Sequence, residues 1–315
     1  VKVTDPDDVG AVNLHYQVVL PGKYVSSFLA KPTSELRSRP NDPRDPNPEF
    51  EDPANWTTIA MVDDGTNGDA IADDSIYTVT LPAQSEARTV VRYRIEAADS
   101  QGVSVRVPYA DDPALNFAYY VYDGVPEYLA SERTVHPDGV PYTHSQEVMT
   151  SLPVYTLITD EGDFIQCIAY STSDQVSRDA FDARSAFNWS GTFVYDGVVY
   201  DHIKYRLRQR NDRYGGNGKR SMRFRFNRGS YPRLTDVWGN PLPERTRTLN
   251  SSKMRARGGK NFGLHETMNN MMWNLVGVAA PSTHWFHFRV VKDRDEVPQG
   301  SIFGPNKDAQ FTGDF

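Results

Sequence analysis

Apolar and polar residues alternate with a period of two in four short stretches near the start of the chain. These stretches are residues 13–20, 76–81, 89–97 and 117–122. β-branched and aromatic residues at this period predict half-buried antiparallel strands. Strands at such spacing within about 120 residues are typical of a β-sandwich. Between the first two stretches, the segment 31–55 carries six prolines, which predicts a long surface loop.

The opening of the chain adds a family signal to this pattern. Thr4-Asp5-Pro6-Asp7 precedes a strand that contains Leu14-His15-Tyr16. This phrase resembles the start of bacterial immunoglobulin-type and fibronectin-type modules. We therefore expect an Ig-like or fibronectin type III-like β-sandwich over residues 1–124, followed by a linker over 125–150.

Residues 151–315 mix strand and helix patterns. A strand is predicted at 152–159, and Asp196-Gly197 between two apolar stretches predicts a hairpin with a type I′ turn. In the return strand, apolar residues alternate with cations, which therefore share one face: Lys204, Arg206 and Arg208. The next strand follows the same pattern, with Arg223 and Arg225 opposite its apolar residues.

A helix is predicted at residues 261–277. Its apolar residues fall on one stripe: Leu264, Met268, Met271, Met272, Leu275 and Val276. Gly277 suits the position just past a helix end, and Pro281 prevents continuation. We expect the stripe to lie in the core, with the methionines as packing residues, and Glu266 to lie on another face.

Charge is distributed unevenly along the chain. The net charge is −7, yet residues 204–257 contain sixteen Lys and Arg against three acidic residues. A basic block in an acidic chain indicates a site for phosphate or another polyanion; the alternative is a solvated basic face. The lone Cys167 excludes an internal disulfide framework and a Cys-based zinc cage. No apolar run is long enough to cross a membrane.

The segment 63–74 combines closely spaced carboxylates with glycines. Its acidic residues are Asp63, Asp64, Asp69, Asp73 and Asp74. Several oxygens at this spacing can surround Ca²⁺, which prefers oxygen ligands, although the spacing is not that of an EF-hand. Asp, Asn and Gly also form turns unaided. A calcium site and a plain turn are therefore both open.

A glycine-rich turn precedes the strand at residues 222–226. It reads Gly215-Gly216-Asn217-Gly218-Lys219. Backbone N–H groups in such a turn, together with a lysine, can hold a phosphate group. The spacing is not that of a Walker A loop, and a plain hairpin turn explains the pattern equally well.

Six features follow one another in a fixed order along this region. They are Tyr195-Asp196-Gly197-Val198, the strand 203–208, the run 218–226, Leu249-Asn250, the helix with Glu266, and Gly277-Val278-Ala279-Ala280-Pro281. In combination they resemble the CotH family of protein-kinase-like proteins, of the spore-coat-kinase type, over residues 152–291. The resemblance implies an α+β kinase-like N-terminal lobe over 151–315, incomplete in this chain, and makes the whole chain β-rich and multidomain.

The resemblance also implies a cofactor site for ATP and a divalent metal such as Mg²⁺. Lys219 would grip the nucleotide phosphates, and Glu266 would orient that lysine, as in the strand-lysine and helix-glutamate pair of kinases. The implied site is completed by Arg206, Arg208, Gly216 and Gly218. Asn211-Asp212 stand where the family usually has a glycine.

The implied activity is ATP-dependent phosphorylation of Ser or Thr in an exported or cell-surface protein of a bacterium. The family's general base and metal-binding acids lie in a second lobe that would follow Phe315, so the chain as given is expected to be inactive. Two alternatives remain open. One is a module that binds an anionic polymer through the basic block, and the other is a structural surface protein. No nucleic acid partner is expected.

Overall fold

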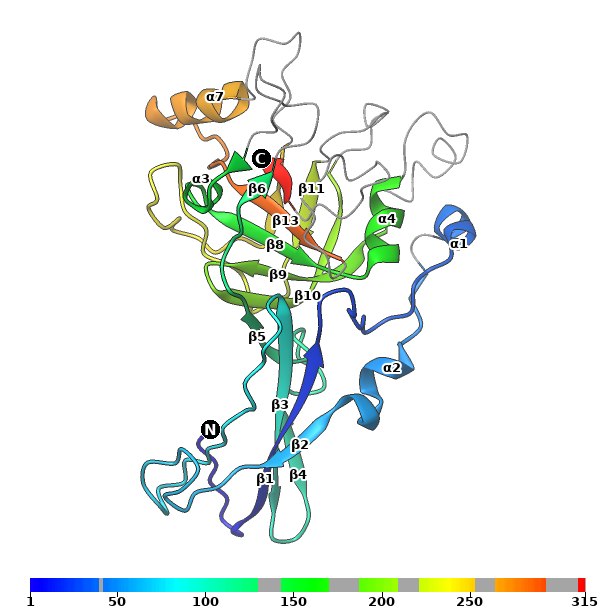
Figure 1. The fold of residues 1–315 in the computed structure, drawn as a ribbon, viewed down its shortest axis with the longest axis vertical. Coiled ribbons are helices and arrows are strands. Elements are labelled where there is room, and N and C mark those ends of the chain that lie inside the picture. The colour runs from blue at the N-terminus through cyan, green and yellow to red at the C-terminus, as the bar shows by residue number, and fades with distance from the viewer. Residues whose placement is uncertain are drawn as a thin grey trace.

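The described residues form two large β-sheets that meet at a shared core, and a small two-stranded sheet (Figure 1). This computed structural model describes residues 1–39, 42–129, 143–169, 187–208, 221–252, 264–292 and 311–314. The β-rich class predicted from the sequence is confirmed. No helix among these residues combines the length and the apolar character that a membrane span requires.

The first sheet has five strands in the order β2-β1-β3-β4, with β5 also paired to β3. Its strands are β1 (Val9–Val19), β2 (Thr57–Ala60), β3 (Thr89–Asp99), β4 (Ser104–Val107) and β5 (Phe117–Val121). Three of the four predicted strands are thus confirmed. β1 and β3 are the long central pair, antiparallel from Val9↔Asp99 to Val19↔Val90.

The fourth predicted strand, residues 76–81, pairs only through the isolated bridges Lys2↔Ile76 and Val62↔Thr78. Its side chains Tyr77, Val79 and Leu81 nevertheless pack against the core of the first sheet. The alternation in residues 76–81 therefore arises because the segment covers one face of the sheet with every second side chain. Among the described residues the five strands form one sheet, and the two-sheet sandwich stays a prediction.

The proline-rich segment 31–55 is not a surface loop throughout, so that prediction is wrong in part. It contains three short helices: α1 (Thr33–Ser38), α2 (Pro48–Glu51) and the 3-10 helix η1 (Pro53–Asn55). Leu36 is 0% exposed and belongs to the core of the second sheet, and Phe50 is 2% exposed. Pro48 and Pro53 begin helices, a position that suits proline. The prolines are therefore compatible with short helices, whose apolar residues Leu36 and Phe50 pack into the protein interior.

The second sheet has seven strands in the order β12-β11-β10-β9-β8-β13-β14. They are β8 (Val154–Ile158), β9 (Trp189–Tyr195), β10 (Val198–Leu207), β11 (Met222–Arg225), β12 (Thr248–Asn250), β13 (His287–Val291) and β14 (Phe311–Asp314). β8 and β13 are parallel, and the other pairs are antiparallel. Asp196 (φ 51°) and Gly197 (φ 72°) form the tight β9–β10 turn, as the Asp-Gly pair predicts.

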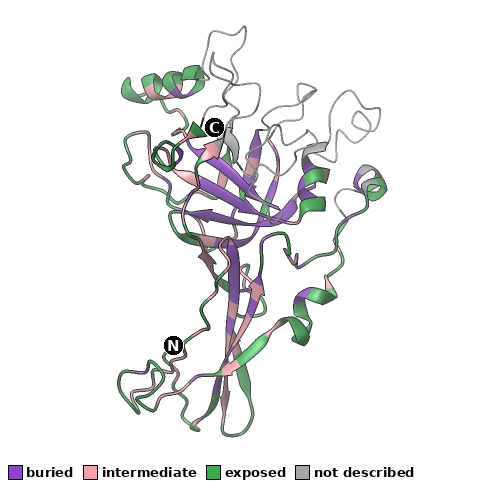
Figure 2. Cartoon of the chain, viewed as in Figure 1, coloured by how far each residue is buried: buried purple, intermediate pink, exposed green. Residues whose placement is uncertain are grey.

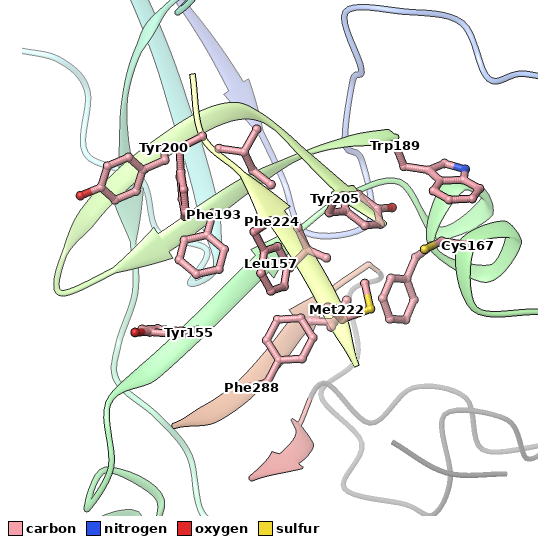
Figure 3. Close-up of a cluster of buried hydrophobic side chains, with 14 of the residues drawn as sticks. Tyr155, Leu157, Cys167, Trp189, Phe193, Tyr200, Tyr205, Met222, Phe224 and Phe288 are labelled. Atoms are coloured by element: carbon pink, nitrogen blue, oxygen red, sulfur yellow. The ribbon is translucent and has the colours of Figure 1, made fainter. Parts of the chain in front are cut away.

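One face of this sheet carries the main core, which is rich in aromatic side chains (Figure 3). Tyr205, Phe193 and Phe224 are fully buried there, together with residues of α4 (Glu161–Ala169). The predicted alternation in β10 is confirmed, since Ile203, Tyr205 and Leu207 are all buried. The cations between them consequently lie on the opposite face.

Helix α7 (Leu264–Leu275) forms where the sequence predicts a helix, but its apolar stripe is not in the core. Met268, Met272 and Leu275 are 49%, 62% and 79% exposed, and Thr267 is the one buried residue of the helix. Figure 1 shows α7 at the outer edge of the molecule, where it does not cover a face of the sheet. The prediction of a buried stripe is wrong, because a 3.6-residue period shows that one face is apolar without showing what covers it.

The segment predicted as a linker, 125–150, has short elements at both ends of its described part. β6 (Tyr128–Leu129) pairs with β7 (Thr143–His144), and α3 (Gln146–Met149) follows with Ser145 as its N-cap. Residues 130–142 lie outside the described part of the chain.

A buried ion pair joins the two sheets. Figure 2 shows buried residues along the ends of β1 and β3 that meet the second sheet. Arg92 of β3 is fully buried, and its Nε lies 2.9 Å from Oδ2 of Asp201 in β10. Arg92 also donates to Gln17 Oε1 at 3.0 Å and to the backbone carbonyl of Val25 at 2.7 Å. Each donor group of the guanidinium therefore has a partner.

The Asp201 carboxylate accepts several further bonds. Asn116 Nδ2 lies 3.1 Å from Asp201 Oδ2, His202 Nε2 lies 3.1 Å from the same oxygen, and the Thr192 hydroxyl donates to Oδ1. Burial by itself would raise the pKa of Asp201, but the charge of Arg92 and these hydrogen bonds hold it well below its usual range. Asp201 is therefore ionised although it is buried.

We expect Arg92→Leu to lower the free energy of unfolding by about 3–5 kcal/mol, because it leaves the Asp201 carboxylate buried without its counter-charge. The double substitution Arg92→Leu with Asp201→Leu should recover much of that loss. Urea denaturation of the three proteins measures both effects. The matched control is Arg233→Leu, an exposed arginine, which should change stability by less than about 0.5 kcal/mol. A loss in Arg92→Leu no larger than the control's contradicts the assignment.

Asp163 in α4 gives the fold a pH dependence. Burial and, to a smaller extent, the charge of Asp160 raise its pKa from 3.8 to about 6, against the opposing charge of Arg44. The folded chain thus binds more protons than the unfolded chain between these values, so this group lowers stability as pH rises from 3.8 to about 6. Asp163→Asn should therefore raise the free energy of unfolding at pH 8 by about 3 kcal/mol. At pH 3 it should have little effect, and an equal change at both pH values contradicts the prediction.

Candidate functional site

The cation Arg208 and the carboxylate Glu266 come together at one end of the second sheet. Arg208 Nη2 lies 3.4 Å from Glu266 Oε1, and the Ser252 hydroxyl donates to Glu266 Oε2 at 2.7 Å. Arg208 follows the last residue of β10, and its backbone N–H donates to the Ser221 carbonyl at 2.9 Å. Glu266 lies in the first turn of α7. Two of the residues predicted for cofactor binding are therefore in contact.

The other predicted phosphate contacts divide into two groups. Lys219, Gly216 and Gly218 lie outside the described residues, so the predicted approach of Lys219 to Glu266 stays a prediction. Arg206 lies on the same face of β10 as Arg208 and is half-buried. Ser252 was not singled out from the sequence, where a lone serine two residues after Leu249-Asn250 carries no signal.

The cations of β10 and β11 form one basic face, as their alternation predicts. The two strands are antiparallel neighbours, and the register places Lys204 opposite Arg225 and Arg206 opposite Arg223. Side chains of directly opposite residues lie on the same side of a sheet, where like charges destabilise each other. Burial lowers the pKa of Arg206, and the positive charge of Arg223 lowers it further.

Counter-charges for this face are scarce within the described residues. No carboxylate among them forms an ion pair with Lys204, Arg223 or Arg225. Arg208 has Glu266, but that pair is partly exposed to solvent, and exposed pairs add little stability. Lys204, Arg223 and Arg225 thus have no carboxylate partner in the part of the chain that the structure describes.

The acidic segment of the first sheet brings three of its five predicted metal ligands together. One carboxylate oxygen each from Asp63, Asp69 and Asp74 lies within 4.8 Å of the others, and Asp69 is buried. Asp64 is exposed and bonds to the backbone N–H and hydroxyl of Thr66, which lower its pKa. Asp73 lies outside the cluster, in the left-handed conformation at φ 61°.

The same carboxylates also hold the loop together. Asp63 accepts from the backbone N–H groups of Asp74 and Ser75 at 3.2 and 2.8 Å. Asp69 Oδ2 accepts from Gly65 N at 2.8 Å. The turn interpretation is therefore supported by these bonds, and the convergence of three acidic oxygens is compatible with a calcium site. Both interpretations stay open.

Comparison with protein-family models, with curated proteins and with solved structures finds no match for this chain. The candidate sites rest on the residues alone.

If the cluster binds Ca²⁺, a saturating concentration should raise the melting temperature and EDTA should reverse the rise. At a hundredfold excess over Kd the stabilisation is about 2.7 kcal/mol. Asp69→Asn should abolish the response, because it removes a buried ligand from the cluster. Asp64→Asn is the matched control and should keep the response, since Asp64 lies outside the cluster. Equal melting curves with Ca²⁺ and with EDTA leave only the turn.

Proposed function

We propose that the second sheet with α7 is the nucleotide-binding lobe of a CotH-like protein kinase, preceded by an immunoglobulin- or fibronectin-type unit. The parent protein would be an exported or surface protein of a bacterium that phosphorylates Ser or Thr residues of another exported protein. The observation that carries the proposal is the contact between Arg208 on the sheet and Glu266 on the helix. Kinases hold nucleotide phosphates with a strand cation that a helix glutamate orients.

The residues at this end suit the phosphates of ATP. Arg206 and Arg208 present guanidinium groups on one face, and guanidinium donors match phosphate oxygens in pairs. Glu266 holds Arg208 from the helix side while Ser252 holds Glu266. Bound ATP would supply the transferable phosphate group. The binding contacts assigned to this chain are Arg206, Arg208, Glu266 and, from the sequence, Lys219, Gly216 and Gly218.

The divalent metal of the family fits this end less well. Mg²⁺ needs carboxylate and phosphate oxygens. Glu266 is already bonded to Arg208 and Ser252. The proposal therefore assigns phosphate binding to these residues and assigns no metal ligand at this end of the sheet.

A second candidate function is polyanion binding, which the row of opposed cations favours. Lys204↔Arg225 and Arg206↔Arg223 place four like charges side by side. An extended anionic polymer would neutralise them together. Its binding would fall steeply with salt and would be spread over many cations, whereas nucleotide binding would depend on a few residues.

Titration calorimetry with ATP–Mg²⁺ distinguishes the two candidates. We expect micromolar-range binding that Arg208→Gln weakens by about tenfold, because a charge-assisted hydrogen bond is lost. Glu266→Gln should weaken it less, since the cation remains but is no longer oriented. Arg233→Gln is the control and should bind as the unaltered chain does.

Two outcomes would contradict the nucleotide proposal. One is absence of ATP–Mg²⁺ binding by the unaltered chain, and the other is equal binding by Arg208→Gln. If a sulfated polysaccharide binds instead, with an affinity that falls steeply between low and physiological salt, the polyanion candidate takes its place.

A further inference from the structure

A separate hollow of about 440 Å³ lies at the other end of the basic face. Arg208, just past the end of β10, is four residues from Lys204, which corresponds to about 13 Å along an extended chain. The residues that matter in its lining are four cations, an amide and an aromatic ring: Lys204, Arg225, Arg228, Arg247, Asn227 and Tyr231. None of them belongs to the proposed nucleotide contacts.

The backbone around this hollow is held by a connected set of hydrogen bonds. Phe226 N donates to the Arg247 carbonyl at 3.0 Å, which fixes Arg247 beside the end of β11. Asn227 Nδ2 donates to the carbonyls of Asp201 and His202 at 3.1 and 3.4 Å. The turn that carries Arg228 closes with a bond from Ser230 N to the Asn227 carbonyl at 3.1 Å. The four cations are thus held in place by the backbone: Lys204 and Arg225 lie on paired strands, Arg228 lies in the turn, and Arg247 lies beside β11.

The lining contains no acidic residue. Among the described residues, no carboxylate forms an ion pair with Lys204, Arg225, Arg228 or Arg247. Lys204 and Arg225 are directly opposite each other in the sheet, a position at which like charges repel. An anion in the hollow would reduce the repulsion of all four groups at once.

We propose that this hollow is a second anion site, which binds the phosphate or sulfate ester group of a small ligand. Guanidinium groups present paired donors that match tetrahedral oxyanions, and Lys204 adds a point charge. Tyr231 packs against the main core and offers an aromatic wall for the uncharged part of the ligand. The volume lies in the range of small-ligand pockets. This site is independent of the nucleotide proposal.

The test is calorimetric titration of the full chain with glucose 6-phosphate, glucose 6-sulfate and glucose. We expect both esters to bind and glucose not to bind, with the phosphate ester tighter because it carries more charge. Arg225→Gln and Arg247→Gln should each weaken ester binding by about tenfold. Lys204→Gln is a third variant, to be used if either arginine variant melts at a lower temperature. The exposed Arg233→Gln, whose side chain does not line the hollow, should bind as the unaltered chain does.

Cross-titration keeps the two sites apart. Arg225→Gln should bind ATP–Mg²⁺ as the unaltered chain does, and Arg208→Gln should keep its affinity for glucose 6-phosphate. If the esters bind and ATP–Mg²⁺ does not, the anion-site proposal is supported and the nucleotide proposal fails. The anion-site proposal is overturned if neither ester binds or if glucose binds equally well. It is also overturned if Arg208→Gln and Arg225→Gln each weaken the binding of ATP–Mg²⁺ and of glucose 6-phosphate to the same extent.

Discussion

The buried pair between Arg92 and Asp201 fixes how the two large sheets lie against each other. Two charges that leave water lose several kcal/mol of hydration free energy each, which their attraction offsets only when their hydrogen bonds are also satisfied. Here Gln17, Val25, Asn116, His202 and Thr192 complete the two groups. The two sheets cannot easily move relative to each other, because a shift would leave a buried charge without its partner. The pair therefore fixes the position of one sheet relative to the other.

Asp201 lies in an irregular part of β10, and this irregularity decides which face of the strand is basic. The pairing of β9 with β10 shifts between Tyr200 and Ile203, and His202 has a positive φ of 53°. Tyr200 and Ile203 both point into the main core although they are three residues apart. Strict alternation would put only one of them there. The bulge thus turns Lys204, Arg206 and Arg208 outward, so the basic face depends on the same few residues that receive Arg92.

Sequence patterns identify local elements well in this chain and long-range partners poorly. Asp196-Gly197 predicts its turn, and the alternation in 203–208 predicts the basic face, because both depend on neighbouring residues. Arg92 and Asp201 are far apart in sequence, and each by itself looks like an ordinary exposed charge. The apolar stripe of α7 has the pattern of a buried helix face, yet Met272 is exposed. The hollow depends on the Lys204↔Arg225 register and on the turn after β11, and neither follows from residue type.

The ion pairs Arg92–Asp201 and Arg208–Glu266 are suited to different roles because of their exposure. Arg92 and Asp201 are almost inaccessible, so opening that pair would leave charges in a medium that solvates them poorly. Arg208 and Glu266 are 29% and 53% exposed, and such a pair contributes about 0–1 kcal/mol. Glu266 contacts Arg208 through Nη2, so the other guanidinium donors would meet an approaching phosphate group while Glu266 keeps the side chain oriented. The buried pair fixes the position of the sheet, and the exposed pair leaves its cation available for a ligand.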